Sequence, residues 1–315
     1  MKLSVVIASR ATETSLSNLQ RIFTCLNRQT FKDFEIILVC DRFFEKEEFW
    51  IFQEELLETI DGIPLTFVTN LNSTFIPQTK GGASAWRNAW IQKATWEFIQ
   101  LFDDDNSFDE TYFETEFQRY EKLKKQTKSE CILCPTLKYR ETWTIQNQGF
   151  SHFCYRQARP KIHIHQQNTF EEIQMFSGNG IFGKREILQA VKYDEHIARI
   201  AEDIDFTLSL HEQWNRLFCI KDLEVQHYER DKTILEQARI WSYEQAKQKS
   251  RNRFLFVHKH GNGWQKIQFY TIGLPWCLLW LSIKALRFWG KGKWKIIKGL
   301  RRGVFEGIKH IFIKK

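Results

Sequence analysis

The segment Glu97-Phe98-Ile99-Gln100-Leu101-Phe102-Asp103-Asp104-Asp105-Asn106 joins an apolar run to three consecutive acidic residues. The apolar half has the length of a buried strand, and it stops where the aspartates begin. Adjacent carboxylates repel one another, so at the end of a buried strand they destabilise the fold unless a cation neutralises them. Mg²⁺ and Mn²⁺ prefer oxygen ligands and often complete their shell with phosphate oxygens. The alternative for this segment alone is a solvated acidic turn that caps a helix.

The residues before this segment alternate between strand and helix patterns. Apolar and β-branched runs predict strands at residues 5–7, 34–40, 65–68 and 97–102. Between them, apolar residues at helical spacing predict helices over 16–26, 49–57 and 83–96. Such alternation predicts an α/β fold with a mostly parallel central sheet and helices on both faces. Ligands of these folds bind beyond the carboxyl ends of the strands, where the aspartate run lies.

Two further residues of the first hundred are candidates for a ligand site. Asp41 follows the second predicted strand, and its carboxylate can accept hydrogen bonds from a base or a ribose, although a turn aspartate is an equally good interpretation. Arg87 lies in the helix that follows Gly81-Gly82, where a guanidinium group can hold a phosphate. The alternative for Arg87 is an exposed helix arginine.

A second acidic group and a histidine occur later in the chain. The group Ala201-Glu202-Asp203-Ile204-Asp205 begins a predicted helix over 202–214. A carboxylate at this point can take a proton from a hydroxyl group, or it can simply complement the helix dipole. His227 follows predicted strands over 217–220 and 225–227 and can bind a metal ion through its neutral imidazole, although a lone histidine is more often structural.

The composition describes an ordered protein, with 43% hydrophobic and 15% aromatic residues. Its net charge of +8 comes entirely from residues 284–315, which contain eleven Lys and Arg and a single acidic residue, Glu306, whereas the rest of the chain is slightly acidic. A nucleic-acid-binding protein would spread such charge over its folded surface, so no nucleic-acid partner is expected. Seven cysteines do not suggest a disulfide framework, and Cys131 and Cys134 are interpreted as buried thiols rather than zinc ligands. A cytoplasmic location is therefore expected.

The C-terminal region predicts contact with a membrane. Residues 267–283 are mostly apolar but only just long enough to span a bilayer. The cationic stretch that follows has apolar residues at helical spacing, which is typical of a helix lying on an anionic membrane surface. We therefore expect a catalytic domain at 1–230 and a helical region at 231–315, whose segment 265–315 attaches peripherally to the inner face of the cell membrane. The alternative is a helical pair packed on the catalytic domain.

Taken in order, these features resemble family 2 glycosyltransferases with the GT-A fold, particularly the bacterial rhamnosyltransferase-like members. The resemblance covers roughly residues 2–260. It is carried by Leu3-Ser4-Val5-Val6-Ile7, Cys25-Leu26-Asn27-Arg28-Gln29-Thr30, Glu35-Ile36-Ile37-Leu38-Val39-Cys40-Asp41, Gly82 to Asn88, Phe98 to Asn106, and Tyr193-Asp194-Glu195 through Glu202-Asp203-Ile204-Asp205-Phe206 to His227.

The resemblance implies an inverting, hexosyltransferase-type enzyme. It would move a sugar from a nucleotide-diphosphate sugar to a hydroxyl of a glycan or lipid-linked acceptor in bacterial surface polysaccharide synthesis. The implied catalytic base is Asp203, with Glu202 beside it. The implied nucleotide contacts are Ser9, Asp41, Arg87, Asp103 and Asp104. The implied ligands of an Mg or Mn ion are Asp105, Asp103 and His227.

The chain departs from the family pattern at two places. Ala8-Ser9-Arg10-Ala11 replaces the usual Pro-Thr-Tyr-Asn after the first strand, and Cys40 replaces the first aspartate after the second. One alternative function is a sugar nucleotidyltransferase of similar fold, which usually carries a glycine-rich phosphate loop, whereas residues 9–14 contain no glycine. Another alternative is a non-catalytic membrane-associated assembly protein whose acidic run only caps a helix.

Overall fold

A computed structural model describes residues 1–9, 13–40, 46–60, 62–68, 82–161, 169–177, 179–197, 201–213, 216–228, 243–288 and 293–312. Asp41 lies outside the described residues, and so does the first part of the helical region expected from residue 231. No helix among the described residues is long and apolar enough to cross a membrane.

The first hundred residues form the alternation of strands and helices that the sequence predicts. The elements are β1 (Leu3–Ser9), α1 (Glu13–Asn27), β2 (Phe34–Cys40), α2 (Lys46–Leu57), β3 (Leu65–Val68), α3 (Gly82–Lys93) and β4 (Phe98–Asp103). Several boundaries differ by two or three residues, since β1, α1 and α2 begin earlier than expected and α3 ends at Lys93 rather than at residue 96. The residues after α3 are hydrogen-bonded to side chains of the sheet instead. Thr95 Oγ1 donates to Glu35 Oε1 at 2.9 Å, and the Trp96 amide donates to Ser4 Oγ at 3.3 Å.

The rest of the chain completes the sheet and adds a group of helices. The elements up to residue 227 are β5 (Asn106–Ser107), α4 (Tyr112–Thr127), β6 (Cys131–Tyr139), β7 (Ile145–Asn147), β8 (His152–Cys154), η1 (Tyr155–Gln157), β9 (Arg159–Lys161), β10 (Phe170–Ile173), β11 (Ile181–Lys184), α5 (Arg185–Ala190), α6 (Glu202–Glu212) and β12 (Arg216–His227). They are followed by α8 (Tyr243–His260), α9 (Gly263–Gln268), the π-helical turn η2 (Phe269–Gly273), α10 (Leu274–Phe288) and α11 (Lys293–Phe312).

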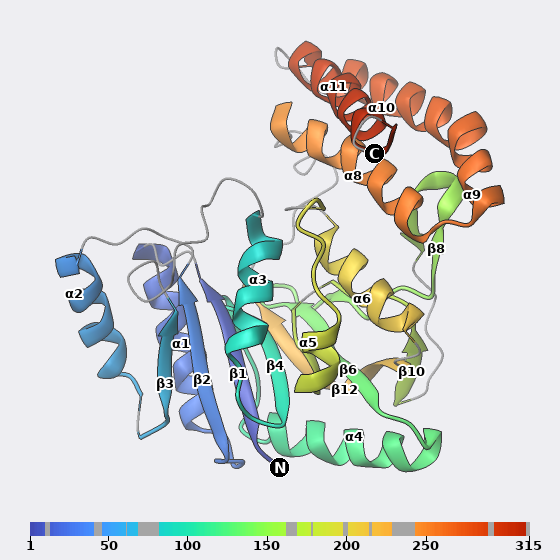
Figure 1. Cartoon of the computed structure of the whole chain (residues 1–315). Helices are drawn as coiled ribbons and strands as arrows, with labels where there is room; N and C mark the ends of the chain where they lie inside the picture. Colours follow the sequence, from blue (N-terminus) through green and yellow to red (C-terminus); the bar gives the residue numbers. More distant parts are fainter. Residues whose placement is uncertain are drawn as a thin grey trace.

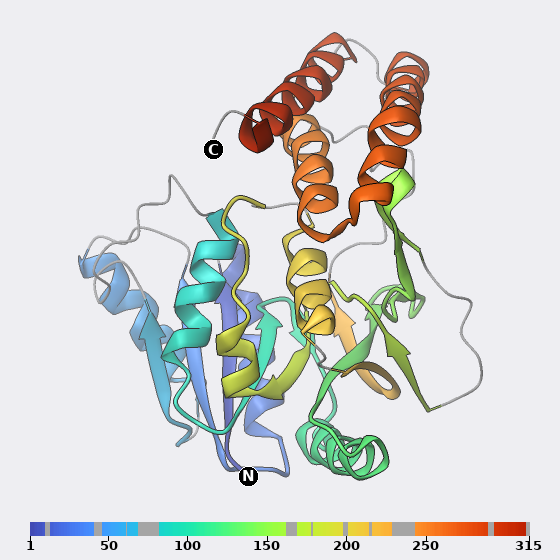
Figure 2. The ribbon, with the colours of Figure 1, turned by 45° about the vertical axis from the view of Figure 1, so that its right-hand side comes forward.

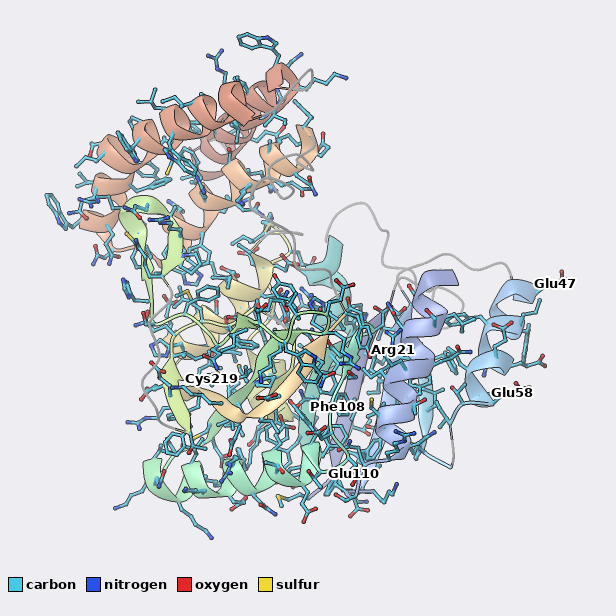
Figure 3. The ribbon with its side chains drawn as sticks, turned by 180° about the vertical axis from the view of Figure 1, so that it is seen from behind. Arg21, Glu47, Glu58, Phe108, Glu110 and Cys219 are labelled. Atoms are coloured by element: carbon cyan, nitrogen blue, oxygen red, sulfur yellow. The ribbon has the colours of Figure 1, made fainter. Side chains whose placement is uncertain are left out.

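The central sheet has the order β10-β12-β6-β11-β4-β1-β2-β3. Strands β3, β2, β1 and β4 are parallel, whereas β11 runs antiparallel to β4 and β6, and β12 is parallel to β6. Helices α3 and α6 lie on one face and α1 and α4 on the other (Figures 1 and 3). The predicted α/β class, with a mostly parallel sheet and helices on both faces, is confirmed.

The register of the parallel strands brings their carboxyl ends to one level. Ser9 pairs with Cys40 across β1 and β2, and Ala8 pairs with Asp103 across β1 and β4. The two strands predicted at 217–220 and 225–227 are one strand, β12, with an irregularity between Ile220 and Glu224. Its far end pairs His227 with Asn106 of β5. The bend therefore carries β12 to the same edge of the sheet as the aspartate run.

Two hydrophobic cores support this arrangement. The larger one lies on the sheet and includes the buried free thiols of Cys131 and Cys134, as the sequence predicts. The second lies where the C-terminal helices meet the β8–β9 hairpin and α6, and it includes Phe153, Leu208 and Phe254. Figures 1 and 2 show these helices beyond the carboxyl ends of the parallel strands. The catalytic part and the expected C-terminal region therefore share a core across the proposed boundary at residue 230.

Helix α11 packs along α8, and this corrects one expectation. A Cβ atom added to Gly299 would lie 2.4 Å from a backbone oxygen of α8, and one added to Gly303 would lie 2.0 Å from another. These glycines therefore allow α11 to approach α8 very closely. One apolar face of α11 is buried, with the side chains of Ile296, Ile297, Leu300 and Ile311, whereas Trp294, Phe305 and Ile308 are exposed. Because protein covers this face, it is not the membrane-facing surface that the amphipathic spacing suggested.

Candidate functional site

The aspartate run lies in the turn between β4 and β5, and two asparagines hold that turn in place. Asn106 Nδ2 donates to Asn179 Oδ1 at 2.6 Å, and Asn179 Nδ2 donates back to Asn106 Oδ1 at 2.9 Å. Asn179 Oδ1 also accepts from the Asp103 amide at 3.2 Å. Both asparagine side chains are buried. A buried, fully paired polar contact of this kind fixes the direction of the three carboxylates.

Asp104 points toward the end of β1. Ser9 Oγ donates to Asp104 Oδ2 at 2.5 Å, so Ser9 reaches this site through the carboxylate. Burial raises the pKa of Asp104 to about 6, and the hydrogen bond from Ser9 offsets part of this rise. Burial, together with the nearby charge of Asp104, also raises the pKa of Cys40 to about 12. Cys40, which stands where an aspartate was expected from the resemblance, is therefore neutral. It adds no further negative charge next to Asp104.

Asp105 and His227 form a second contact in the same turn. His227 Nε2 lies 3.0 Å from Asp105 Oδ2, and its Nδ1 lies 3.0 Å from Gln146 Oε1. The other carboxylate oxygen, Asp105 Oδ1, is buried and has no hydrogen-bond partner among the described residues. A buried carboxylate oxygen without a donor is costly unless a cation or a ligand satisfies it.

Asp105 and His227 have the chemistry and the position to bind a divalent cation. Histidine ligands usually donate their other ring N–H to an acceptor, as His227 can do to Gln146. Within the described part of the chain, however, no three His, Cys, Asp or Glu side chains gather closely enough to hold a metal by themselves. An ion here would therefore take only one or two protein ligands and would need phosphate oxygens to complete its shell, as Mg²⁺ often does. The predicted ligands Asp105 and His227 are adjacent, whereas Asp103 is directed toward Arg87.

Arg87 connects the two acidic groups of the sequence. Its Nη1 donates to Asp203 Oδ1 at 2.6 Å and to Glu202 Oε1 at 3.0 Å, while Nη2 lies 4.0 Å from Asp103 Oδ1. Only 15% of the Arg87 side chain is exposed, so it is not the exposed helix arginine of the alternative interpretation. Carboxylates separated by a hundred residues in the chain therefore meet on one guanidinium group.

Asp203 lies in the first turn of α6 and is held in an unusual electrostatic state. Burial raises its pKa to about 7. The positive charge of Arg87 counteracts this, and the negative charges of Glu202 and Asp103 add to it. A carboxylate with a pKa near neutrality is suited to accept a proton under physiological conditions. Its neighbour Glu202 is itself mostly buried.

A second set of contacts ties this helix to the C-terminal helices. Asp205, two residues after the candidate base, is fully buried and contacts Lys259 Nζ and His260 Nε2, each at 2.7 Å. Both partners lie at the end of α8. The acidic first turn of α6 therefore has two different uses, since Asp203 faces the site and Asp205 anchors α8.

The structure brings together all of the predicted site residues that it describes, which are Ser9, Arg87, Asp103, Asp104, Asp105, Glu202, Asp203 and His227. Asn179 and Gln146 are supporting residues that were not predicted. The tight turn around Gly180 was a signal for the first, whereas no local signal marked the second. Arg21, which Figure 3 labels, is connected to this site through Tyr228. Its guanidinium carbon lies 3.7 Å from the centre of the Tyr228 ring, and Tyr228 donates its amide to the Asp105 carbonyl oxygen at 2.9 Å.

Solved structures of S. aureus TarS have a similar fold. TarS residues 1–349 in complex with UDP-GlcNAc align with a TM-score of 0.55 and 13% identity, covering 98% of this chain and 92% of that chain. The same fragment in complex with UDP aligns with a TM-score of 0.51 and 15% identity, with the same coverage. A longer TarS chain is covered to 55%, with a TM-score of 0.53, 14% identity and 97% of this chain aligned.

No curated protein sequence matches this chain. Residues 4–192 do match a family model, and these residues contain β1 to α5 with the whole aspartate run and Arg87. The match covers more than half of the chain, and the chain belongs to Glycosyl transferase family 2.

Proposed function

We propose that this glycosyltransferase acts with inversion on a nucleotide-diphosphate sugar and transfers the sugar to a hydroxyl group of a glycan or lipid-linked acceptor. Surface polysaccharide synthesis in bacteria is the proposed setting. The observation that carries the proposal is that Arg87 contacts both Asp103 and Asp203. The aspartate run at the end of β4 therefore lies beside the carboxylate of Asp203, whose pKa is raised. The groups proposed to bind the donor and to accept the proton thus lie at one edge of the sheet.

A UDP-sugar is the proposed donor. TarS, which shares the fold, was crystallised with UDP and with UDP-GlcNAc. Ser9 and Asp104 at the ends of β1 and β4 are the proposed contacts to the nucleoside, together with Asp41. The rhamnosyltransferase-like subtype stays a prediction about the sugar itself.

In the proposed reaction, Asp203 accepts the proton of the acceptor hydroxyl as its oxygen attacks the anomeric carbon. The bond between that carbon and the diphosphate oxygen breaks, and the nucleoside diphosphate leaves with the bonding electrons. Arg87 holds Asp203 in place and keeps a positive charge between the base and the acidic run. Asp105 and His227 are the proposed ligands of an Mg or Mn ion, which when bound would offset negative charge on the departing diphosphate.

Calorimetry with UDP, GDP and dTDP, each with and without Mn²⁺, tests the donor class. We expect UDP to bind at least about tenfold more tightly with Mn²⁺, because two protein ligands need phosphate oxygens to complete the shell. Incubating the preferred nucleotide-sugar with candidate acceptors and detecting free nucleoside diphosphate then tests transfer. A sugar nucleotidyltransferase would release pyrophosphate instead, and an assembly protein would bind none of the nucleotides.

The pH dependence of transfer follows from the raised pKa of Asp203. The carboxylate must be deprotonated to act as base, so kcat should rise with pH up to about 7 and level off above it, falling about tenfold per unit below. Asp104 also has a raised pKa, near 6, but its protonation should weaken donor binding and appear in KM. A kcat that does not change between about pH 5 and about pH 8 would contradict Asp203 as the base.

A further inference from the structure

The helix that runs from α9 through η2 into α10 has an unusual outer face. Surface helices normally turn charged and polar residues to the solvent. Between residues 263 and 283, none of the described side chains that are exposed is charged. The exposed positions carry the tryptophans Trp264, Trp276 and Trp280, each at least 51% exposed. They also carry the aliphatic residues Ile267, Ile272, Leu279 and Ile283, each at least 51% exposed.

These seven residues, here called the apolar ridge, follow one another at intervals of three to five positions, apart from the adjacent pair Leu279 and Trp280. The five-residue interval crosses the π-helical turn η2, so the residues lie along one side of the helix. The opposite side is fixed to the protein. Phe269 is fully buried in the second core, and a Cβ atom added to Gly273 would lie 1.7 Å from the Arg156 backbone oxygen of η1. The ridge is therefore the outward side of a firmly packed helix, and about 30 Å of it can lie flat against a surface.

We propose that the apolar ridge docks this protein on a lipid bilayer with anionic headgroups, with the helix lying in the plane of the interface. Helix α11, which contacts α10, supplies the complementary charge. Its exposed cationic residues are Lys295, Lys298, Arg301, Arg302 and Lys309. Its single acidic residue, Glu306, is bound by Arg302 Nε at 2.9 Å. Tryptophan at the edge of an apolar surface beside Lys and Arg is typical of membrane interfaces.

This surface differs from the one that the amphipathic spacing of the sequence suggested. The apolar face of α11 packs on α8, so α11 offers its cations, and α9 to α10 offer the apolar contact. A second copy of the chain is a poorer occupant. A two-fold contact between ridges would bring two cationic α11 faces toward each other, and like charges oppose such an approach.

The docked orientation matters for the site. Figures 1 and 2 show α8 to α11 beyond the carboxyl ends of the parallel strands, where the acidic run lies. Asp205 of α6 is held by Lys259 and His260 at the end of α8, two residues from Asp203. A bilayer under the ridge would thus lie on the site's side of the sheet and present a lipid-linked acceptor to it. The docking itself does not depend on the proposed function, and only this role for the acceptor rests on it.

Vesicle co-sedimentation of the full chain tests the proposal. Vesicles of phosphatidylcholine with phosphatidylglycerol should bind the wild type, and added salt should weaken the binding, because surface charges are screened. The triple variant Trp264→Ser, Trp276→Ser, Leu279→Ser should bind at least about tenfold more weakly, since three large apolar side chains are lost from the contact. The double variant Lys298→Glu, Arg301→Glu should lose most of its preference for anionic over neutral vesicles.

A matched control is Trp50→Ser with Trp143→Ser, which removes two tryptophans of similar exposure, 55% and 52%, from other parts of the surface. This control should bind vesicles as the wild type does. Unchanged nucleotide binding and thermal unfolding of the ridge variant confirm that its fold and its donor site are intact. Wild-type binding by the triple variant, or no vesicle binding by the wild type, would overturn the proposal. A dimeric wild type that the triple variant converts to a monomer would instead identify a second copy as the occupant.

Truncation after Gly261 is a less informative test. It removes α11, whose Ile311 belongs to the second core and whose glycines line α8. The truncated chain would expose apolar surface of α8, and that surface can itself bind lipid or aggregate. Substitutions of exposed ridge residues avoid this because they leave the core intact.

Discussion

Asp203→Asn should keep donor binding and reduce the rate of transfer by about 10² to 10⁴-fold, the usual contribution of a general base. Asparagine has nearly the same shape as aspartate, and its Oδ1 can still accept the hydrogen bond that Arg87 Nη1 now donates to Asp203. What the variant loses is a group that can take a proton. We therefore expect kcat to fall while the calorimetric dissociation constant of the nucleotide changes little.

A matched control is Asp222→Asn, which makes the same chemical change in β12 at a surface ion pair with Arg119. That variant should transfer at the wild-type rate, since surface pairs contribute little to stability. Substantial residual transfer by Asp203→Asn would show that another group accepts the proton. The pH profile of this variant would then test the assignment, because the limb near pH 7 should disappear if Asp203 causes it in the wild type.

Asp105→Ala should remove the metal dependence of nucleotide binding. Mn²⁺ should no longer strengthen binding of the nucleotide. In the presence of Mn²⁺, the affinity for the nucleotide should therefore fall by about 10 to 100-fold, as is usual when a metal site is disrupted. The reason lies in the buried Oδ1 atom, which has no hydrogen-bond partner among the described residues, and in Oδ2, which faces His227 Nε2 at 3.0 Å. Calorimetry with and without Mn²⁺ measures the effect directly.

The control for this variant is Asp33→Ala, an exposed aspartate at the opposite end of β2. It should respond to Mn²⁺ as the wild type does. If Asp105→Ala keeps the full effect of Mn²⁺, the metal assignment is wrong, and the carboxylate has a structural role in holding the β4–β5 turn. The His227→Gln variant then offers a second check on the same pair, with the same readout.

The sheet and its helices could be predicted because their signals are local. Strands buried on both faces consist mostly of apolar residues. The stretches Phe34 to Cys40 and Phe98 to Phe102 show this, each with one polar residue, Glu35 or Gln100. Helix α4 was not predicted, although its buried residues Tyr112, Phe113, Glu116, Phe117, Tyr120 and Leu123 follow helical spacing. The irregular strand β12 was divided in two because its bend interrupts the apolar pattern at Lys221 and Asp222.

The site could be predicted as a set of residues but not as a set of contacts. Position at the end of a strand was enough to select Asp103, Asp104 and Asp105. No local pattern shows that Arg87 would be shared between Asp103 and Asp203, because those partners come from β4 and from a helix more than a hundred residues later. The raised pKa of Asp203 likewise depends on burial by several elements at once.

For the C-terminal helices too, the sequence predicts the helices but not their contacts. The sequence alone established a mostly apolar segment at 267–283 and, after it, apolar residues at helical spacing among cationic ones, which predicts a helix with two different faces. It could not say which face protein would cover, because periodicity is the same for a face turned to a core and a face turned to a membrane. That choice depended on Gly299, Gly303 and Gly307, which let α11 approach α8 closely and so left the ridge of α9 and α10 outside.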